Sequence, residues 1–187
     1  MTKDSPAPDF RRISTEPLYV GRVFTLTQEI FESPAGQRFD RQIVRHNGAV
    51  AVVALHDDHS VSLILQYRPA IGARIFEIPA GLCDRLDEPR EDAARRELQE
   101  EVGLAASSME LLGDTTPAPG LTDERVTIYL ARGLTHVGAS AEGPEEDDLV
   151  VHRMPLTDAL AMIDRGEIID GKTVIGLLRT ERLLRSP

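Results

Sequence analysis

The sequence is compatible with an α/β domain, because segments with strand character come first along the chain and helices come last. Residues 49–55 form an almost continuous apolar run, which is typical of a strand covered on both faces. Residues 89–103 have helical periodicity between a proline and a glycine. The chain has 187 residues, of which 41% are hydrophobic, and this is enough for one domain with a sizeable core.

Composition excludes several classes of protein. The net charge is −10, from 21 basic and 31 acidic residues, which argues against a nucleic-acid-binding surface. Cys83 is the only cysteine, so an intrachain disulfide is impossible and a reducing compartment, the cytoplasm, is expected. No basic-then-apolar leader and no apolar run of membrane-spanning length occurs in the sequence, so we expect no membrane partner.

The N-terminal quarter of the chain is expected to form strands. Residues 1–11 are polar and proline-containing and are predicted to be a flexible tail. Residues 12–45 are predicted to be strands with turns. Residues 24–31 alternate in polarity, and after the Ser33-Pro-Ala-Gly turn signal residues 38–44 are expected to form the returning strand of a hairpin. A hairpin exposed in this way could bury its face against another subunit.

Further elements follow towards the C-terminus. Short strands are predicted at four places: residues 61–66, 109–112, 126–131 and 149–151. Thr157 and Asp158 can cap a helix that runs through Asp164, and Asp170 can open a final helix. The apolar side of this last helix is predicted to contain Ile175, Leu178 and Leu183. Because no linker divides them, residues 12–187 are predicted to be a single domain.

The helix at residues 89–103 carries a strip of carboxylates. Glu97 and Glu101 lie one above the other at i, i+4, and Glu100 lies beside them. The adjoining arc is apolar and can pack into a core: Ala94, Leu98 and Val102. Crowded carboxylates repel one another, which raises their pKa values unless a cation is bound. Hard oxygen ligands of this kind suit Mg²⁺ or Mn²⁺, although a solvated helix face would also explain the pattern.

The stretch from Gly81 to Leu104 resembles the Nudix box, Gly-x5-Glu-x7-Arg-Glu-U-x-Glu-Glu-x-Gly-U, in which U is a bulky aliphatic residue. The residues that match in register are Glu88, Arg96, Glu97, Leu98, Glu100, Glu101, Gly103 and Leu104. Six residues, not five, separate Gly81 from Glu88, so the loop before the helix carries an insertion. The resemblance implies the Nudix fold, an α/β/α sandwich around a mixed β-sheet, with an N-terminal antiparallel β-sheet region.

Other features are similar to the ADP-ribose and nucleoside-diphosphate-sugar branch of the Nudix hydrolases. The EIPAG run precedes the box, Pro119 follows Leu104 by fifteen residues, and Glu124 follows a Pro-Gly pair. The resemblance implies that Pro119 and Glu124 belong to the substrate site and that the carbonyl of Ala80 completes the metal shell. It also implies that Arg68 and Glu77 line the substrate cleft, although charges at strand edges are common without such a role.

An acidic segment at residues 145–148 follows a small, flexible stretch. By composition it is a solvated loop. A mobile acid that can approach a helix-bound metal cluster is nevertheless what a hydrolytic water requires as its base. Members of the branch carry their catalytic glutamate here, and the register favours Glu145, with Glu142 and Glu146 as alternatives. The residue that stacks on adenine is left open among Tyr19, Phe24, Phe31 and Tyr67.

Together these features imply Mg²⁺-dependent hydrolysis of ADP-ribose to AMP and ribose 5-phosphate. Two or three Mg²⁺ ions, or Mn²⁺ in their place, would be held by Ala80, Glu97, Glu100 and Glu101. Arg96 would orient the carboxylates through a salt bridge, and a homodimer would share the N-terminal strands. The alternatives are hydrolysis of another nucleoside diphosphate sugar or of an oxidised nucleoside triphosphate, and a sensor that binds ADP-ribose without cleaving it.

Overall fold

A computed structural model describes residues 9–85, 87–139 and 148–185. The contacts within the chain divide it into two compact units. Unit 1 consists of Met1–Asn47 and Ala118–Glu124, and unit 2 consists of Gly48–Pro117 and Arg125–Pro187.

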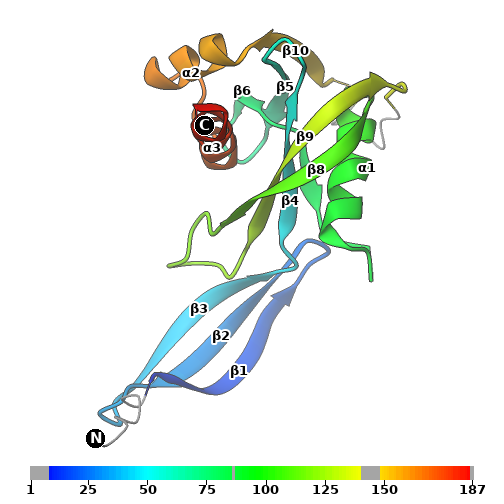
Figure 1. The fold of residues 1–187 in the computed structure, drawn as a ribbon. Coiled ribbons are helices and arrows are strands. Elements are labelled where there is room, and N and C mark those ends of the chain that lie inside the picture. Colours follow the sequence, from blue (N-terminus) through cyan, green and yellow to red (C-terminus); the bar gives the residue numbers. More distant parts are fainter. Residues whose placement is uncertain (1–8, 86, 140–147, 186–187) are drawn as a thin grey trace, which may run out of the picture. The chain divides into compact units, whose positions relative to one another are not determined.

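Unit 1 is a three-stranded antiparallel sheet in the order β1-β2-β3 (Figure 1). Its strands are β1 (Arg11–Val20), β2 (Phe24–Glu32) and β3 (Arg38–His46), so the predicted hairpin is present. The β2–β3 turn is closed by a hydrogen bond in which the Ser33 N–H donates to the Gln37 carbonyl at 2.9 Å. The segment 118–124 joins this sheet because the Val44 N–H donates to the Leu121 carbonyl at 3.0 Å.

The side chains of unit 1 are largely exposed. Every residue of β1 is exposed, and several are apolar: Ile13, Leu18, Tyr19 and Val20. Among the described residues of unit 1, only Thr27 and Glu29 are buried, at 4% and 0% exposure. Since burial of apolar surface is the main stabilising contribution in folding, this sheet contains little core of its own.

Unit 2 is built on a seven-stranded mixed sheet. Its strands are β4 (Ala49–Leu55), β5 (Ser60–Arg68), β6 (Ala73–Glu77), β7 (Ala80–Leu82), β8 (Leu104–Thr115), β9 (Val126–His136) and β10 (Val150–Pro155). The main order is β10-β5-β4-β9-β8, with β6 paired to β5 and β7 paired to β4. β4 and β9 are parallel, and the other pairs are antiparallel. The predicted mixed sheet is therefore confirmed.

Helices cover both faces of this sheet (Figure 1). α1 (Arg90–Val102) packs with Val50, Val52 and Ile64 on one face. α2 (Leu156–Asp164) and α3 (Gly171–Arg185) pack on the other face, around Val53 and Leu63. All seven residues of β4 are buried, as the apolar run predicted, because alternate side chains enter the two cores.

The helix ends follow the sequence with small differences. Pro89 was the first residue of the predicted helical segment. In the structure it is the N-cap of α1, with ψ at 142°, and the helix begins at Arg90. Gly103 ends α1 in the left-handed conformation, with φ at 66°, and β8 begins at the next residue. α2 begins after Pro155, and neither Thr157 nor Asp158 caps it.

Two predictions about individual elements, α3 and β8, need correction. Leu178 was expected on the apolar side of α3 but is 47% exposed, whereas Leu177 is fully buried. The strand predicted at residues 109–112 is longer in the structure, where it belongs to the twelve-residue β8.

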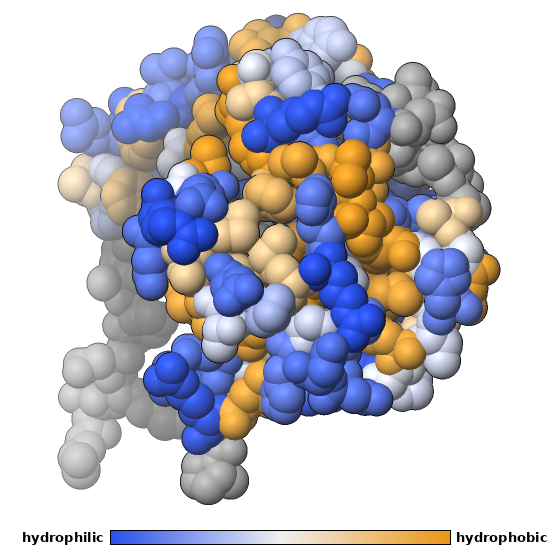
Figure 2. Space-filling view, turned by 90° about the horizontal axis from the view of Figure 1, so that it is seen from above, coloured by the Kyte–Doolittle hydropathy of each residue, from blue (hydrophilic) through white to orange (hydrophobic). Residues whose placement is uncertain are grey.

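The surface seen from above is partly apolar, and hydrophilic side chains cross the apolar area (Figure 2). Among the described residues, no helix is long and apolar enough to cross a membrane.

Candidate active site

The carboxylate strip of α1 lies against strand β7. Glu97 and Glu101 are 7% and 8% exposed, and Leu98 between them is fully buried. The Ala80 N–H donates to Glu101 Oε2 at 2.8 Å. A Cβ at Gly81 would lie only 2.0 Å from Glu97 Cδ, so only glycine allows this carboxylate to approach the strand so closely. The EIPAG run and the Nudix-like helix therefore form one local structure within unit 2.

Arg96 connects the carboxylates of this strip. Its Nη1 donates to Glu97 Oε1 at 2.5 Å and to Glu100 Oε2 at 2.7 Å, and its Nε donates to Glu88 Oε1 at 3.2 Å. Burial alone would lower the pKa of Arg96, but the hydrogen bond to Glu88, the charge of Glu97 and the hydrogen bond to Glu100 raise it. The expected salt bridges are present, and the effect of Arg96 on catalysis stays a prediction.

The donor chemistry of the strip suits a hard divalent cation. Carboxylate oxygens of Glu97, Glu100 and Glu101, with the carbonyl of Ala80, are the ligand types that Mg²⁺ and Mn²⁺ prefer. Within the described part of the chain, however, no three acidic, histidine or cysteine side chains are grouped so that they could hold a metal ion. One oxygen of each of these carboxylates accepts a hydrogen bond in the structure, from the Ala80 N–H or from Arg96. The metal assignment therefore stays a prediction.

The one-residue insertion before Glu88 is absorbed in a turn. The Glu88 N–H donates to the Arg85 carbonyl at 3.3 Å. Asp87 has φ at 62°, in the left-handed region that aspartate tolerates better than most residues. On the N-terminal side of the turn, the Cys83 N–H donates to the Gly48 carbonyl at 3.1 Å, which holds the chain to the sheet. The box begins and ends on regular elements, and the extra residue lies between them.

Arg68 and Glu77 form a second charged cluster at the ends of β5 and β6. Glu77 is 1% exposed, and its carboxylate accepts hydrogen bonds from Arg68 Nε at 2.6 Å and from Arg68 Nη2 at 2.8 Å. Lys172 Nζ also contacts Glu77 Oε2. Burial alone would raise the pKa of Glu77, but the hydrogen bond from Arg68 and the charge of Lys172 lower it. Glu77 is therefore a buried anion with two cationic partners.

Sequence reasoning missed Lys172 and its neighbours as members of this cluster. Lys172 Nζ lies 3.1 Å from Asp170 Oδ2, and the Thr173 N–H donates to the same oxygen at 3.0 Å. Asp170 therefore caps α3, as the sequence predicted. Asp170 indicated the start of a helix, and nothing in the sequence around Lys172 indicates that this lysine contacts Glu77, which lies 95 residues earlier.

The remaining predicted site residues lie elsewhere. Pro119 and Glu124 belong to unit 1, where the Glu124 N–H donates to Thr122 Oγ1 at 3.0 Å. Their place relative to the carboxylate strip stays a prediction. Glu142, Glu145 and Glu146 lie outside the described residues. Of the four aromatic candidates for adenine stacking, only Tyr67 belongs to unit 2.

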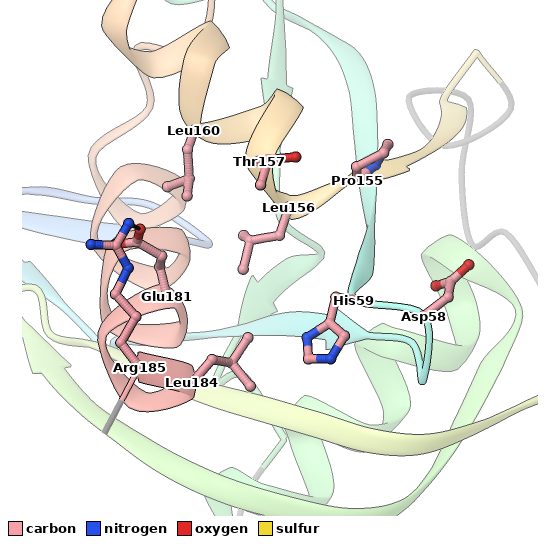
Figure 3. A pocket seen from close by; sticks show the side chains of 9 residues that line it. All are labelled: Asp58, His59, Pro155, Leu156, Thr157, Leu160, Glu181, Leu184 and Arg185. Atoms are coloured by element: carbon pink, nitrogen blue, oxygen red, sulfur yellow. Dashed lines mark ion pairs between the residues drawn. The ribbon is translucent and has the colours of Figure 1, made fainter. Parts of the chain in front are cut away.

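A cavity of about 370 Å³ lies on the face of the sheet opposite α1. Leu156 and Leu160 of α2 and Leu184 of α3 point into it, and the turn residues Asp58 and His59 border it (Figure 3). None of the predicted site residues lines this cavity. It is therefore separate from the carboxylate strip.

Comparison with known families identifies the family to which this chain belongs. Residues 45–174 match the NUDIX domain family. The match covers most of the chain and includes α1 and β7, and the chain therefore belongs to the NUDIX family. Hydrolases of this family are generally dependent on a divalent metal ion.

Individual relatives cover almost the whole chain. A Mycobacterium tuberculosis (strain ATCC 25618 / H37Rv) protein named ADP-ribose pyrophosphatase is 42% identical over 170 residues, which cover 91% of this chain and 82% of the relative. A Bacillus methanolicus protein named methanol dehydrogenase activator is 39% identical over 168 residues, which cover 89% of this chain and 90% of the relative. The solved structure of an ADP compounds hydrolase superimposes with a TM-score of 0.85 at 24% identity and covers 97% of both chains, which confirms the fold.

Proposed function

We propose that this protein hydrolyses the pyrophosphate bond of ADP-ribose in the presence of Mg²⁺, and that the products are AMP and ribose 5-phosphate. One observation carries the proposal. The buried carboxylate strip of α1 lies against β7 in a chain that is 42% identical to a protein named ADP-ribose pyrophosphatase. The NUDIX family supplies the reaction class, and this relative supports the substrate.

Glu97, Glu100 and Glu101, with the carbonyl of Ala80, would hold two or three Mg²⁺ ions, for which Mn²⁺ could substitute. Bound ions of this kind neutralise a diphosphate and acidify a water molecule. Because Arg96 bonds both Glu97 and Glu100, it orients these carboxylates and lowers their mutual repulsion. Glu88, which also bonds Arg96, fixes the direction of the guanidinium.

The substrate's phosphates need positive charge, which a protein with a net charge of −10 must supply locally. Arg68 is the candidate in unit 2, because a guanidinium has five N–H donors and Glu77 accepts from two of its nitrogens. Pro119 and Glu124 are assigned to the substrate site from their spacing beyond the box. Glu145 is assigned as the residue that accepts the proton of the attacking water, with Glu142 and Glu146 as alternatives.

We also propose that residues 12–187 work as one domain in a cytoplasmic homodimer that shares the N-terminal strands. The exposed apolar side chains of β1 support this assembly, because a sheet with so few buried residues gains stability when a second copy covers it. Cys83 as the only cysteine supports the reducing compartment.

A product assay tests the proposed activity. Purified protein is incubated with ADP-ribose, ADP-glucose, NADH, diadenosine polyphosphates and 8-oxo-dGTP, with Mg²⁺ or with EDTA. We expect AMP and ribose 5-phosphate, fastest from ADP-ribose, and no product with EDTA. Faster release of products from 8-oxo-dGTP or from another nucleotide sugar would refute the substrate assignment. Tight binding of ADP-ribose without turnover in Mg²⁺ would instead identify a sensor.

A further inference from the structure

The cluster around Glu77 contains one more cation than its carboxylate needs. Arg68 alone binds Glu77 in a two-point arrangement, through Nε at 2.6 Å and Nη2 at 2.8 Å. An arginine in this geometry satisfies a carboxylate in both charge and hydrogen bonding. Lys172 nevertheless places its ammonium on the same carboxylate, and its side chain is only 15% exposed. Since it is costly to bury a second charge, this lysine needs an explanation.

Lys172 is held in place from the other side by the cap of α3. Asp170 Oδ2 lies 3.1 Å from Lys172 Nζ and accepts the hydroxyl of Thr173 at 2.6 Å. The Thr173 hydroxyl oxygen in turn accepts the Ile78 N–H at 2.9 Å. Ile78 follows Glu77 directly in the chain, so the N-terminus of α3 is fixed to the connection between β6 and β7. The ammonium group of Lys172 therefore has a defined position.

Besides binding Glu77, Arg68 interacts electrostatically with the carboxylate strip. The hydrogen bond to Glu77 raises the pKa of Arg68, and the charges of Glu101 and Asp170 add to this effect. Arg68 is thus within electrostatic reach of Glu101, which the Ala80 amide binds at 2.8 Å. If Glu77 had no other partner, its full charge would attract the guanidinium, whereas Lys172 neutralises part of that charge. The remaining N–H donors of Arg68 can then serve an anion other than Glu77.

We propose that Lys172 is a positioning residue, which shares Glu77 with Arg68 and thereby sets the Arg68 guanidinium to bind a phosphate group of a nucleoside diphosphate substrate. The proposal rests on the proposed function, because it assumes a substrate with a pyrophosphate bond. It assigns Glu77 to the support of Arg68 and not to contact with the substrate. A purely structural role for Lys172, attachment of α3 to β6, is the competing explanation.

Kinetics of Lys172→Met separate the two explanations. A positioning role predicts a KM for ADP-ribose raised about tenfold with kcat changed less than about threefold, because one charged contact to phosphate is weakened. Lys172→Arg, which retains the charge, should recover most of the lost affinity. The matched control is Arg165→Met, which removes one positive charge from an exposed ion pair with Glu167 and should leave KM unchanged.

A binding measurement keeps this test independent of turnover. Titration calorimetry with ADP and Mg²⁺ should give a Kd about tenfold weaker for Lys172→Met than for the wild type, with recovery in Lys172→Arg. If the wild type binds ADP but hydrolyses nothing in the panel, the proposed function fails and this comparison still decides the role of Lys172. If Lys172→Met does not fold, Lys172→Gln takes its place.

Three results would overturn the inference. The first is an unchanged KM and an unchanged Kd for ADP in a folded Lys172 variant. The second is a lower unfolding free energy in urea, with neither KM nor Kd altered, which is what attachment of α3 alone predicts. The third is a wild-type protein that does not bind ADP, since there is then no phosphate for Arg68 to hold.

Discussion

Glu29 of unit 1 and the carboxylate strip of α1 in unit 2 differ in the ratio of donors to carboxylates. In unit 1, Glu29 is fully buried and accepts Arg45 Nη2 at 2.6 Å and Thr27 Oγ1 at 2.9 Å, with Arg12 at 3.6 Å. Several partners thus serve one anion. On α1 of unit 2 the ratio is reversed, because Arg96 donates to three carboxylates, those of Glu88, Glu97 and Glu100.

We expect this difference to distinguish a carboxylate that stabilises the fold from one that binds a ligand. A buried anion with enough donors contributes to stability and has no free capacity for a ligand. Several carboxylates that share one cation repel one another, and a bound metal ion relieves that repulsion. The same Glu→Gln substitution should therefore have opposite effects at Glu97 and at Glu29.

The largest effect is expected from Glu97→Gln. It removes a charge that a metal ion requires, so we expect kcat for ADP-ribose to fall by on the order of 100-fold or more. The free energy of unfolding in urea should not decrease, because the repulsion within the strip is reduced. The control is Glu91→Gln on the same helix, where an exposed glutamate accepts hydrogen bonds from Arg95 and activity should be retained. Wild-type turnover in Glu97→Gln would remove the distinction between the units.

Glu29→Gln should show the reverse pattern. The amide keeps the size of the side chain but weakens the bonds from Arg45, so we expect the free energy of unfolding to fall by about 1–3 kcal/mol. The kcat at saturating ADP-ribose should stay close to the wild-type value, since Glu29 has only structural partners. Glu16→Gln on the exposed strand β1 serves as the control, with a change of less than about 0.5 kcal/mol. A loss of kcat without a loss of stability would contradict the structural role.

The smallest effect concerns the pH dependence of stability. Burial alone would raise the pKa of Glu29, but Arg45 and Thr27 lower it below the ordinary value of 4.5. A carboxylate with a lowered pKa in the folded state stabilises the fold above the unfolded pKa, and this contribution is lost as pH falls through the folded pKa. We therefore expect urea denaturation below about pH 4.5 to show a steeper loss of stability for the wild type than for Glu29→Gln. Parallel curves would show that Glu29 does not titrate differently on folding.

Much of the fold could be predicted from local patterns. The apolar run of β4, the alternation of β2 and the spaced apolar residues of α1 each reflect burial that repeats with the period of the element. The length of β8 could not be predicted, because Ser107 and Ser108 are exposed and lack strand character. They are strand residues because β8 pairs with β9 along its length, which is a property of the tertiary fold.

The same limit applies to the site. The carboxylates of α1 are close in sequence, so their spacing shows that they share one face of a helix. Lys172 and Glu77 meet only when α3 is placed at the end of β6, and no pattern in either segment records this contact. Residues whose role depends on contacts between distant segments are the ones that the sequence alone missed.

The turn at Arg85–Glu88 has a consequence for how variation in this family is interpreted. Gly81 is fixed by its pairing with Val50 in β4, and Glu88 by its bond to Arg96 of α1. The residues between them act as a spacer whose two ends are anchored independently. Insertions and deletions here should therefore be nearly neutral in evolution, and the chemistry of the helix is a stricter criterion of membership than the number of residues that precede it.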